Sequence, residues 1–574
     1  DAYNADPQNQ YDDWIEIYNP SATPINLAGM YITDDLDEPE KFQFPAGYAS
    51  QTTVPPYGFL IIWADEDITD GPLHVSFQLD ADGEEIALFD SQGILIDSIV
   101  YNSQNTDVSH GRFPDASSDW QYFSTPTPGV NNSEQGIAGW AQTPDFSRQG
   151  CAFSESFMLQ LYADSPDAAI YYTTDGSDPS PASGILYNAP IPISITTHVR
   201  ARVYEPNLAP SDIVGQKYLR LNPDVENFNS NLPIVILDTD GYDINQDCNS
   251  LIEYPRTPTY SVIVDADSSG RAYITDNPDF AGRGGMRVRS KTSAGFAKKQ
   301  YNYELWDEYD QQVNASILGM PEESDWIIHA PYSDKTLMRN YLIYKWSNDI
   351  GQYAVRSKFC EVFLNTDGGA VSYDDYEGVY VFMEKIKIDD NRVDVEGITP
   401  QYDDNITDFG GYIIKRDKKD DDDEVLYLSD GSYMLYHDPK PENMSSQQKS
   451  RLVDGLNQFL SVLNGDNFND PVNGYAKYID VQSFIDHHIL VELARNVDGY
   501  GLSTYMYKDR GGKLKMGPVW DYNLSLGNCY YREGWNSEGW KDFYANWYKR
   551  LFQDPEFRLK QWDRWFELRK DELS

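Results

Sequence analysis

Basic residues are scarce in this chain, with 45 lysines and arginines against 92 aspartates and glutamates and a formal net charge of −47. A protein that binds nucleic acid neutralises phosphates with a basic face, and the sequence shows none. Nucleic acid is therefore excluded as a partner. The sequence also lacks a run of about 18 apolar residues, so no transmembrane helix is predicted.

Cysteines and targeting signals are also sparse. The four cysteines are far apart and form no CxxC pair: Cys151, Cys248, Cys360 and Cys529. This spacing argues against a zinc ribbon and leaves room for one or two disulfides of undetermined pairing. The chain begins with DAYNADPQNQ, which has neither Met nor a signal-like apolar stretch. We therefore expect a mature chain from which a targeting segment has been removed.

Aromatic residues, in contrast, are abundant, at 14% of the chain. This content excludes a disordered chain and favours half-buried strands. A length of 574 residues exceeds what one hydrophobic core usually supports, so about two to four domains are expected. The excess of carboxylates suits a surface exposed to salt and divalent cations, which screen the self-repulsion.

The sequence pattern of residues 1–135 predicts a first β-sandwich. Alternating segments such as WIEIYN and IALFD are separated by Gly, Pro, Asn and Asp, which indicates antiparallel strands. His74 and His110 are isolated, so no catalytic site is predicted here. The segments YDDWIEIYNPSATPINLAGMYITDD, LIIWAD, HVSFQLDADGEEIALFDSQG and DVSHGRFPD together resemble the lamin-tail domain family of bacterial extracellular proteins. The resemblance implies an immunoglobulin-like sandwich that binds or spaces.

Residues 136–222 predict a second, smaller β-sandwich. The cluster TPTPGVNNSEQG at residues 125–136 is typical of a linker, and the alternating segments IYYT and VRARVY follow it. The stretch YYTTDGSDP resembles the small module attached to chitobiase-type and other bacterial surface enzymes, which implies a spacer. Asp175 and Asp178 are then expected to form turns and not to bind a ligand.

Residues 223–574 predict an α+β domain with two lobes, because strand patterns such as GVYVFMEKIKI are followed by helix patterns. In DKTLMRNYLIYKWSNDIG, Asp334 is expected to N-cap a helix that ends at Gly351. The apolar face of that helix is expected to contain Leu337, Tyr341 and Tyr344. A second helix is predicted within DVQSFIDHHILVELARNVDGYG.

The densest basic patch is GGMRVRSKTSAGFAKKQYNYELWD, which contains Arg287, Arg289, Lys291, Lys298 and Lys299. A phosphotransferase needs cationic side chains at the nucleotide phosphates, carboxylates at the metal and a carboxylate near the acceptor hydroxyl. The patch is equally typical of a solvated basic turn that offsets neighbouring carboxylates. It is not a P-loop, because GxxxxGK[ST] is absent from the chain.

Two aspartates, Asp498 and Asp521, follow a predicted helix and a predicted short strand, 521 − 498 = 23 residues apart. The order acid, strand, hairpin, strand, acid is the one by which a kinase fold brings its catalytic and metal-binding aspartates to one cleft. Upstream, a predicted strand ends at Glu384, where main-chain groups can meet an adenine edge. The alternative there is a core strand that ends in an exposed charged loop.

The third domain resembles the CotH family of kinase-like proteins, known from bacterial spore coats and from secreted and surface proteins. The motifs that carry the resemblance run from about residue 230 to the end: RVRSKTSAGFAKKQYNYELWD, LGMPEESDWIIHAPYSDKTLMRNYLIYKWSNDIGQYAVRSKFCEVFLN, YEGVYVFMEKIKIDDNRVD, GGYIIKRDK and NVDGYGLSTYMYKDRGGKLKMGPVWDYNLSLGN. The resemblance implies a two-lobed protein-kinase-like fold that uses ATP with Mg²⁺ or Mn²⁺.

The resemblance also implies roles for individual residues. Asp498 takes the place of the catalytic-loop acid, Asp521 that of the metal-binding acid in the WDYN motif, and Glu384 begins the hinge-like segment. Lys298 and Lys299 match a basic pair of which one is expected to contact phosphate. The expected nucleotide-binding residues are Arg289, Lys298, Lys299, Arg339 and Glu384, and the expected metal-site residues are Asp521, Asn523 and Ser503.

Three residues depart from the family pattern. Ser503 stands where an asparagine for a second metal ion is common, and Asn523 stands where an acid is common. Ser290 stands where the turn often has glycine. Loss of a carboxylate and of an amide ligand lowers the expected affinity for Mg²⁺.

Arg339 and Asn340 match a family helix motif and are expected to help order the nucleotide cleft.

Two acidic segments leave a choice between a solvated charge run and a Ca²⁺ site: KRDKKDDDDEVL at residues 415–426 and DTDGYDINQD at residues 238–247. The second lacks the glycine and the bidentate glutamate of an EF-hand loop. His487 and His488 are adjacent in a predicted helix and point about 100° apart, which makes them unsuited as joint metal ligands.

The sequence thus predicts a secreted or cell-surface bacterial protein whose third domain transfers phosphate from ATP to Ser or Thr of a protein acceptor. In this hypothesis Asp521 and Mg²⁺ hold the phosphates and Asp498 orients the hydroxyl. The alternative is an adhesive or structural surface protein with a weakly active or inactive kinase-like scaffold, which Ser503 and Asn523 motivate. A glycan-binding or glycan-processing role rests only on the chitobiase-type module.

Overall fold

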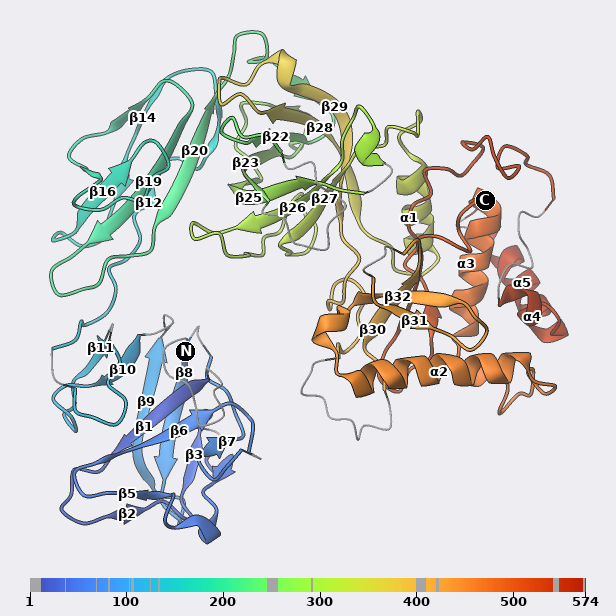
Figure 1. Ribbon diagram of the computed structural model, residues 1–574. Helices are drawn as coiled ribbons and strands as arrows, with labels where there is room; N and C mark the ends of the chain where they lie inside the picture. The colour runs from blue at the N-terminus through green and yellow to red at the C-terminus, as the bar shows by residue number, and fades with distance from the viewer. Residues whose placement is uncertain are drawn as a thin grey trace. The chain divides into compact units, whose positions relative to one another are not determined.

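The computed structural model describes residues 12–574 except 37, 69, 81–82, 103, 105–107, 124, 133–134, 245–255, 291–292, 399–408, 420–422, 540–546, 571–572 and 574. The chain forms two compact units (Figure 1). One unit comprises Asp1–Ser147, Gln160–Pro190 and Arg200–Val214, and the other comprises Arg148–Leu159, Ile191–Val199 and Gly215–Ser574. The second predicted module, residues 136–222, therefore contributes strands to both units.

The N-terminal residues form two small sheets around a shared apolar core, as the alternating pattern predicts. The strand orders are β1-β6-β7 and β4-β3-β8-β9, with the pairs β2-β5 and β10-β11 beside them. The core includes Ile32 from one sheet and Ile62 and Val75 from the other. The strands are β1 (Asp13–Tyr18), β2 (Ile25–Asn26), β3 (Tyr31–Thr33), β4 (Phe42–Gln43), β5 (Thr53–Val54), β6 (Phe59–Ala64), β7 (His74–Val75), β8 (Gly83–Phe89), β9 (Leu95–Asn102), β10 (Ser109–Arg112) and β11 (Trp120–Phe123), and a 3₁₀ turn covers Ala46–Tyr48.

The second module consists of short strands, also as predicted. Within one unit β16 pairs antiparallel with β17 and β19, and within the other β13 pairs with β20 and β14 with β18. Asp175 accepts a bond from Ser177 N at 3.1 Å and Asp178 is ion-paired with Arg200, as turn residues would be. The strands are β12 (Asp145–Phe146), β13 (Cys151–Phe153), β14 (Phe157–Leu159), β15 (Leu161–Tyr162), β16 (Ala169–Thr173), β17 (Ile185–Leu186), β18 (Ile191–Ile193), β19 (Thr197–Tyr204) and β20 (Val214–Arg220).

A closed barrel of order β22-β23-β25-β26-β27-β29-β28 follows. β22 and β28 run parallel and close it, so none of these strands leaves a free edge. Large buried side chains such as Tyr303, Trp326 and Phe382 fill the interior. The strands are β21 (Asn229–Ser230), β22 (Ile234–Asp238), β23 (Thr257–Val264), β24 (Ala272–Tyr273), β25 (Phe280–Val288), β26 (Tyr301–Trp306), β27 (Asp325–His329), β28 (Ser357–Asn365) and β29 (Tyr376–Glu384), with 3₁₀ turns at Ser293–Gly295 and Tyr373–Asp375.

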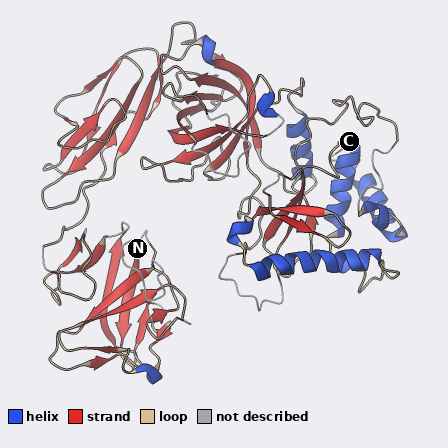
Figure 2. Ribbon diagram, viewed as in Figure 1, coloured by secondary structure: helices blue, strands red, loops and turns tan. Residues whose placement is uncertain are grey.

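The helices gather in the C-terminal region, where they accompany a sheet of order β31-β32-β30-β33-β34 (Figure 2). One apolar core joins this sheet to α2 and α3 through residues such as Ile414, Leu456 and Leu490. The elements are α1 (Arg339–Asp349), β30 (Tyr412–Arg416), β31 (Val425–Tyr427), β32 (Tyr433–Asp438), α2 (Ser446–Asn464), α3 (Val481–Ala494), β33 (Thr504–Lys508), β34 (Lys515–Met516), α4 (Tyr548–Leu551) and α5 (Pro555–Leu568), with 3₁₀ turns at Pro441–Asn443 and Tyr475–Lys477.

The ends of the longer helices follow from capping residues. α2 starts with a capping box in which Ser445 and Gln448 satisfy each other's backbone N–H groups. α3 starts at Asp480, whose side chain accepts from Ser483 N, and stops at Arg495, which adopts a left-handed conformation with φ of 52°. The end of α3 delivers the chain to the loop that contains Asp498.

The predicted start of α1 was wrong by four residues, since the N-cap is Met338 and not Asp334. The helix begins at Arg339, because Leu337 has a left-handed φ of 64° that no helix tolerates. Asp334 still accepts a hydrogen bond from the first helical N–H, that of Arg339, at 2.9 Å. Of the predicted apolar face, Tyr344 is buried, whereas Leu337 and Tyr341 are half-buried. The buried residues of α1 are Asn340, Ile343, Tyr344 and Ser347.

Cysteines and membrane spans can be checked over the described part of the chain. Cys151, Cys360 and Cys529 are buried free thiols, whereas Cys248 lies outside the described residues. No helix in the described ranges is long and apolar enough to cross a bilayer.

Candidate functional site

The two predicted catalytic aspartates lie on loops that are hydrogen-bonded to each other. Asp498 follows α3, and Asp521 follows β34 in a left-handed conformation with φ of 60°. Asn496 joins the loops, because its Oδ1 accepts from Asp498 N at 3.1 Å and its Nδ2 donates to Asp521 O at 3.5 Å. A main-chain bond from Leu526 N to Ala494 O at 2.7 Å adds a second link. The structure thus brings the 23-residue pair together.

Solvent reaches the Asp521 carboxylate, but its environment disfavours the negative charge. Desolvation by the surrounding protein is the main cause that raises its pKa to about 6, and the charge of Asp498 is the second. Arg289 acts in the opposite direction. In the part of the chain that the structure describes, the hydrogen bonds of Asp521 use its main-chain atoms. Its carboxylate oxygens take part in none of them. Such oxygens suit a cation.

Helix α1 fixes the loop that carries Asp521. Tyr344 Oη accepts a hydrogen bond from Asp521 N at 3.3 Å, and Asn340 Oδ1 accepts one from Tyr522 N at 2.6 Å. Asn340 is buried and Tyr522 is fully enclosed, so the second bond is shielded from water. The left-handed backbone at Asp521 is therefore held on both sides by one helix.

Asn340 is also the end of a buried hydrogen-bond chain that reaches the basic turn. Its Nδ2 lies 3.3 Å from His329 Nε2, and His329 Nδ1 lies 2.7 Å from Gln300 Oε1. Gln300 Nε2 then donates to Ser293 Oγ at 2.6 Å. Burial lowers the pKa of His329 to about 3, so the ring is neutral and can donate at one nitrogen and accept at the other. The chain connects the turn after β25 with the Asp521 loop.

Arg339, expected at the nucleotide, binds protein groups in this structure. Its guanidinium is ion-paired with Asp334, whose side chain is 2% exposed, and its Nη2 donates to Leu526 O at 3.3 Å. The residue therefore joins α1 to the segment that follows Asp521. Contact with a nucleotide stays a prediction for Arg339.

Arg289 is the basic residue of the predicted phosphate-binding set whose charge acts on the Asp521 carboxylate. It follows β25, and its guanidinium lies 5.6 Å from the ring centre of Trp520, the residue before Asp521. Desolvation lowers the pKa of this guanidinium, an effect that nearby phenols and the charge of Asp521 oppose. Ser290 has a left-handed φ of 70°, a conformation that glycine would adopt without strain.

Lys298 and Lys299, the predicted phosphate-binding pair, donate to backbone carbonyls. Lys298 Nζ bonds Val379 O at 2.6 Å and lies 4.2 Å from the ring centre of Tyr380, and burial lowers the pKa of its ammonium. Lys299 Nζ bonds Ala294 O within its own turn. Neither lysine has a contact with the aspartate pair among the described residues, so their phosphate roles stay predictions.

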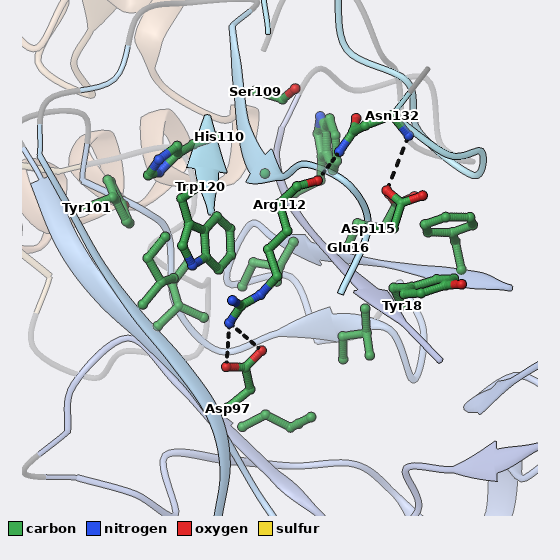
Figure 3. A pocket seen from close by; sticks show the side chains of 18 of the residues that line it. Glu16, Tyr18, Asp97, Tyr101, Ser109, His110, Arg112, Asp115, Trp120 and Asn132 are labelled. Atoms are coloured by element: carbon green, nitrogen blue, oxygen red, sulfur yellow. Dashed lines mark hydrogen bonds and ion pairs between the residues drawn. The ribbon is translucent and has the colours of Figure 1, made fainter. Parts of the chain in front are cut away.

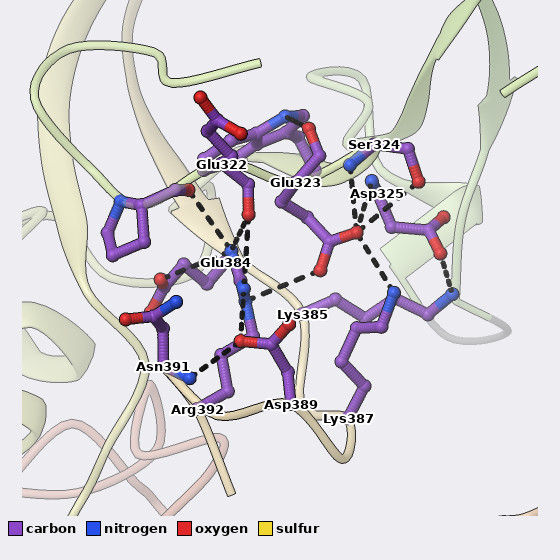
Figure 4. A network of polar contacts seen from close by, with 12 residues as sticks. Glu322, Glu323, Ser324, Asp325, Glu384, Lys385, Lys387, Asp389, Asn391 and Arg392 are labelled. Atoms are coloured by element: carbon purple, nitrogen blue, oxygen red, sulfur yellow. Dashed lines mark hydrogen bonds and ion pairs between the residues drawn. The ribbon is translucent and has the colours of Figure 1, made fainter. Parts of the chain in front are cut away.

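Glu384 ends β29, as expected, with a fully buried carboxylate. It is ion-paired with Arg356 and lies 3.5 Å from Arg392 Nη2, and the buried Arg392 also contacts Glu323 at 3.4 Å. Figure 4 shows this network, in which Lys387 bonds Glu323 at 2.9 Å. These ion pairs fix the segment by which the chain leaves the barrel. A nucleotide contact at Glu384 would come from its main chain, because its carboxylate is already engaged.

The predicted metal site offers few protein ligands. Over the described ranges, no group of three or more His, Cys, Asp or Glu side chains is arranged to hold a metal ion. Mg²⁺, however, is often bound through one or two carboxylates together with substrate phosphates and waters. The single carboxylate of Asp521 fits that donor set. Ser503, with a left-handed φ of 51°, and the half-buried Asn523 supply only neutral oxygens.

The sequence analysis missed several residues around the pair. β30 pairs with β33 so that Arg416 lies opposite Thr504, which brings the charges of Asp417 and Lys418 to bear on Asp521. Distance along the sequence hid this electrostatic interaction, since Asp417 belongs to segment 415–426, for which a charge run or a Ca²⁺ site was expected. Three aromatic residues close to Asp521 were not assigned to the site: Tyr344, Tyr505 and Trp520, of which Tyr344 and Trp520 stack with ring centres 5.8 Å apart.

The acidic segment 238–247 holds a lysine in the part described. Lys217 Nζ lies 2.6 Å from Asp238 Oδ1 and also contacts Asp240, and the side chains of Lys217 and Asp238 are 1% and 0% exposed. An ammonium group therefore occupies the place between these carboxylates. Residues 245–247, and residues 420–422 of the other acidic segment, lie outside the described residues. The two adjacent histidines are buried in α3, and His487 Nδ1 lies 3.1 Å from Tyr548 Oη.

A cavity of about 810 Å³ lies within the N-terminal sandwich, and its lining residues fall between Asp13 and Asn132 (Figure 3). The guanidinium carbon of Arg112 lies 4.5 Å from the ring centre of Trp120. Arg112 Nη2 donates hydrogen bonds to both carboxylate oxygens of Asp97, at 2.7 and 3.0 Å. His110 stacks on Tyr122 at 4.1 Å, and burial lowers its pKa to about 4. The volume is typical of ligand sites. None of the predicted catalytic or metal residues lines this cavity.

Comparison with known families gives three matches in chain order. The family described as CotH kinase protein matches residues 283–574, the Lamin Tail Domain family matches residues 1–103, and the family described as Fn3 associated matches residues 159–218. No curated protein matches the chain. The order of the matches confirms the predicted arrangement of a lamin-tail segment, a small β module and a CotH domain.

Proposed function

Because the chain belongs to the CotH kinase protein family, we propose that residues 223–574 form a two-lobed atypical protein kinase that phosphorylates Ser or Thr of a protein acceptor. The barrel would be the first lobe, and the sheet with α2 to α5 the second. The observation that carries the proposal is the convergence of Asp498 and Asp521 on loops tied by Asn496. The ion-paired segment after Glu384 would connect the lobes.

The residues of the site fit the parts that phosphoryl transfer requires. Arg289 would neutralise nucleotide phosphates, and its electrostatic interaction with Asp521 supports this role. Mg²⁺ or Mn²⁺, when bound, would neutralise charge on the phosphates. Asp521 would hold the ion, with Asn523 and Ser503 as weaker oxygen donors. Asp498 would orient the acceptor hydroxyl and receive its proton.

We also propose that the protein works outside the cell or on its surface. The support is the large excess of carboxylates and the two β modules that precede the CotH domain. A second surface component would then be the acceptor. Ca²⁺ binding by the acidic segment 415–426 is a further part of this proposal.

Transfer of label from γ-labelled ATP, with Mg²⁺ or Mn²⁺, to candidate surface proteins tests the function. Wild type should label an acceptor and Asp521→Asn should not, because the variant loses the one strong metal ligand. Asp310→Asn is the matched control, since Asp310 is also an exposed aspartate with a left-handed φ, of 62°. Equal labelling by wild type and Asp521→Asn would refute the mechanism.

The second candidate function is that of a binding protein with an inactive kinase-like scaffold. The cavity in the N-terminal sandwich and the neutral Ser503 and Asn523 favour it. Thermal unfolding distinguishes the candidates, because a ligand at about 100 times its Kd adds roughly 2.7 kcal/mol of stability. An unchanged melting temperature with every nucleotide and metal combination would favour the scaffold.

A further inference from the structure

The segment that follows Asp521, residues 528–539, covers both carboxylate oxygens of Asp498. Tyr531 Oη donates toward Asp498 Oδ2 at 3.5 Å. Arg532 Nη1 lies 3.6 Å from Asp498 Oδ1 and donates to Val497 O at 3.3 Å. The Asp498 side chain is 24% exposed, so a small opening to solvent remains beside these two residues.

Specific contacts hold this segment in place. Arg495, the residue that ends α3, donates from Nε to Glu533 O at 3.2 Å and from Nη1 to Gly539 O at 3.1 Å. Gly534 packs so closely that a Cβ there would lie 2.6 Å from Cys529 Cβ and 2.8 Å from Val497 Cγ1. The same helix end therefore positions Asp498 and the segment over it.

The hydroxyl of Tyr531 has the relation to Asp498 that an acceptor needs. General-base groups lie within hydrogen-bond reach of the proton that they remove, and contacts in unliganded sites are often long. Burial and the charge of Asp498 raise the pKa of the Tyr531 phenol to about 12, so the phenol keeps its proton and donates it to the carboxylate. In the described part of the chain, Tyr531 is the hydroxyl that donates to this carboxylate.

We propose that Tyr531 is a phosphorylation site of the chain's own active centre, modified within the same molecule. This inference rests on the proposed kinase function and extends its acceptors from Ser and Thr to a tyrosine of the same chain. The phenol oxygen bonds to the γ-phosphorus of a nucleoside triphosphate, and the bond from that phosphorus to the bridging oxygen breaks. The phenol proton passes to Asp498. The products are one phosphotyrosine and one nucleoside diphosphate, so atoms and charge balance.

The adjacent tyrosine provides a strict internal comparison. Tyr530 is 90% exposed, far more accessible than the half-buried Tyr531, and its ring packs against Tyr531 at 5.6 Å. A reaction that follows exposure modifies Tyr530. A reaction that follows proximity to Asp498 modifies Tyr531.

The test is incubation of the full chain with MgATP or MnATP, followed by mass spectrometry that assigns each phosphoryl group to a residue. We expect label on Tyr531 in wild type and in Tyr530→Phe, and none there in Tyr531→Phe. Asp498→Asn should slow the labelling of Tyr531 by about 10²–10⁴-fold, the usual range for loss of a general base. The labelled fraction at a given time should not depend on protein concentration, because donor site and acceptor share one molecule.

A second measurement needs no nucleotide. Spectroscopic titration of the phenols should show one tyrosine with a lower pKa in Asp498→Asn than in wild type, and Tyr531→Phe should abolish that difference. Label on other residues or on added acceptors, with none on Tyr531, would overturn this inference and leave the proposed function intact. Absence of nucleotide binding and of any labelling would overturn both. Label on Tyr530 in place of Tyr531 would also overturn it.

Discussion

Replacing Asn340 by alanine removes the acceptor for the amide of Tyr522, which follows Asp521 directly. The bond is 2.6 Å long, and the two residues are 8% and 2% exposed, so water cannot substitute for the lost oxygen. A buried donor left without a partner costs about 1–3 kcal/mol. The variant also removes the Nδ2 group that lies 3.3 Å from His329 Nε2. We therefore expect the Asp521 loop to open more often.

Hydrogen exchange measures this opening at the amide itself, which avoids a single unfolding free energy for a chain of several domains. A free-energy change of about 1.4 kcal/mol alters an equilibrium constant tenfold. The loss of about 1–3 kcal/mol should therefore make the Tyr522 amide exchange about 5 to 150 times faster in Asn340→Ala. Lys345→Ala is the control on the same helix, because the Lys345 side chain is 56% exposed and its ion pair in the described part of the chain is with Asp349, four residues on. Less than a twofold change at Tyr522 in Asn340→Ala would refute the reasoning that α1 holds the loop.

Two further predictions concern other parts of the chain. Burial lowers the pKa of His110 to about 4 from its usual 6.5, so below pH 6.5 the unfolded state binds a proton that the folded state does not. The stability of the N-terminal sandwich should therefore fall as the pH drops from 6.5 to 4. His110→Gln should flatten this pH dependence in thermal unfolding followed by tryptophan fluorescence. Lys217→Ala leaves the buried Asp238 charge unpaired and should destabilise its unit by about 3–5 kcal/mol in urea unfolding, whereas Lys217→Met with Asp238→Leu should recover most of the loss.

Local patterns predicted the elements of the fold well where the chain has regular periodicity. Alternating segments predicted the N-terminal strands, and the helical pattern within DVQSFIDHHILVELARNVDGYG predicted α3, which runs from Val481 to Ala494. The start of α1 was missed because a left-handed residue, Leu337, interrupts a continuous helical pattern. Backbone conformation of that kind depends on tertiary contacts such as that of Asp334 with Arg339, which sequence periodicity does not contain.

The candidate site shows the same division. The order of Asp498 and Asp521 after regular elements was compatible with one cleft, and the resemblance to the CotH family turned that pattern into a prediction that they meet. The hydrogen-bond partners of the two lysines were not predictable from the sequence, since Lys298 donates to Val379 O, 81 residues further along the chain. Asp417 was missed for a similar reason: only the pairing of β30 with β33 brings it to Asp521.

The most direct test of the central claim is the affinity of Mn²⁺ with ATP, measured by calorimetry or by the paramagnetic signal of free Mn²⁺. The account predicts saturable binding to wild type and to Asp310→Asn, weakened by at least about tenfold in Asp521→Asn, since even an outer-shell group at a metal site is usually worth that much. Equal affinity in wild type and Asp521→Asn would contradict the proposal, because Asp521 would then not hold the metal ion of a bound nucleotide.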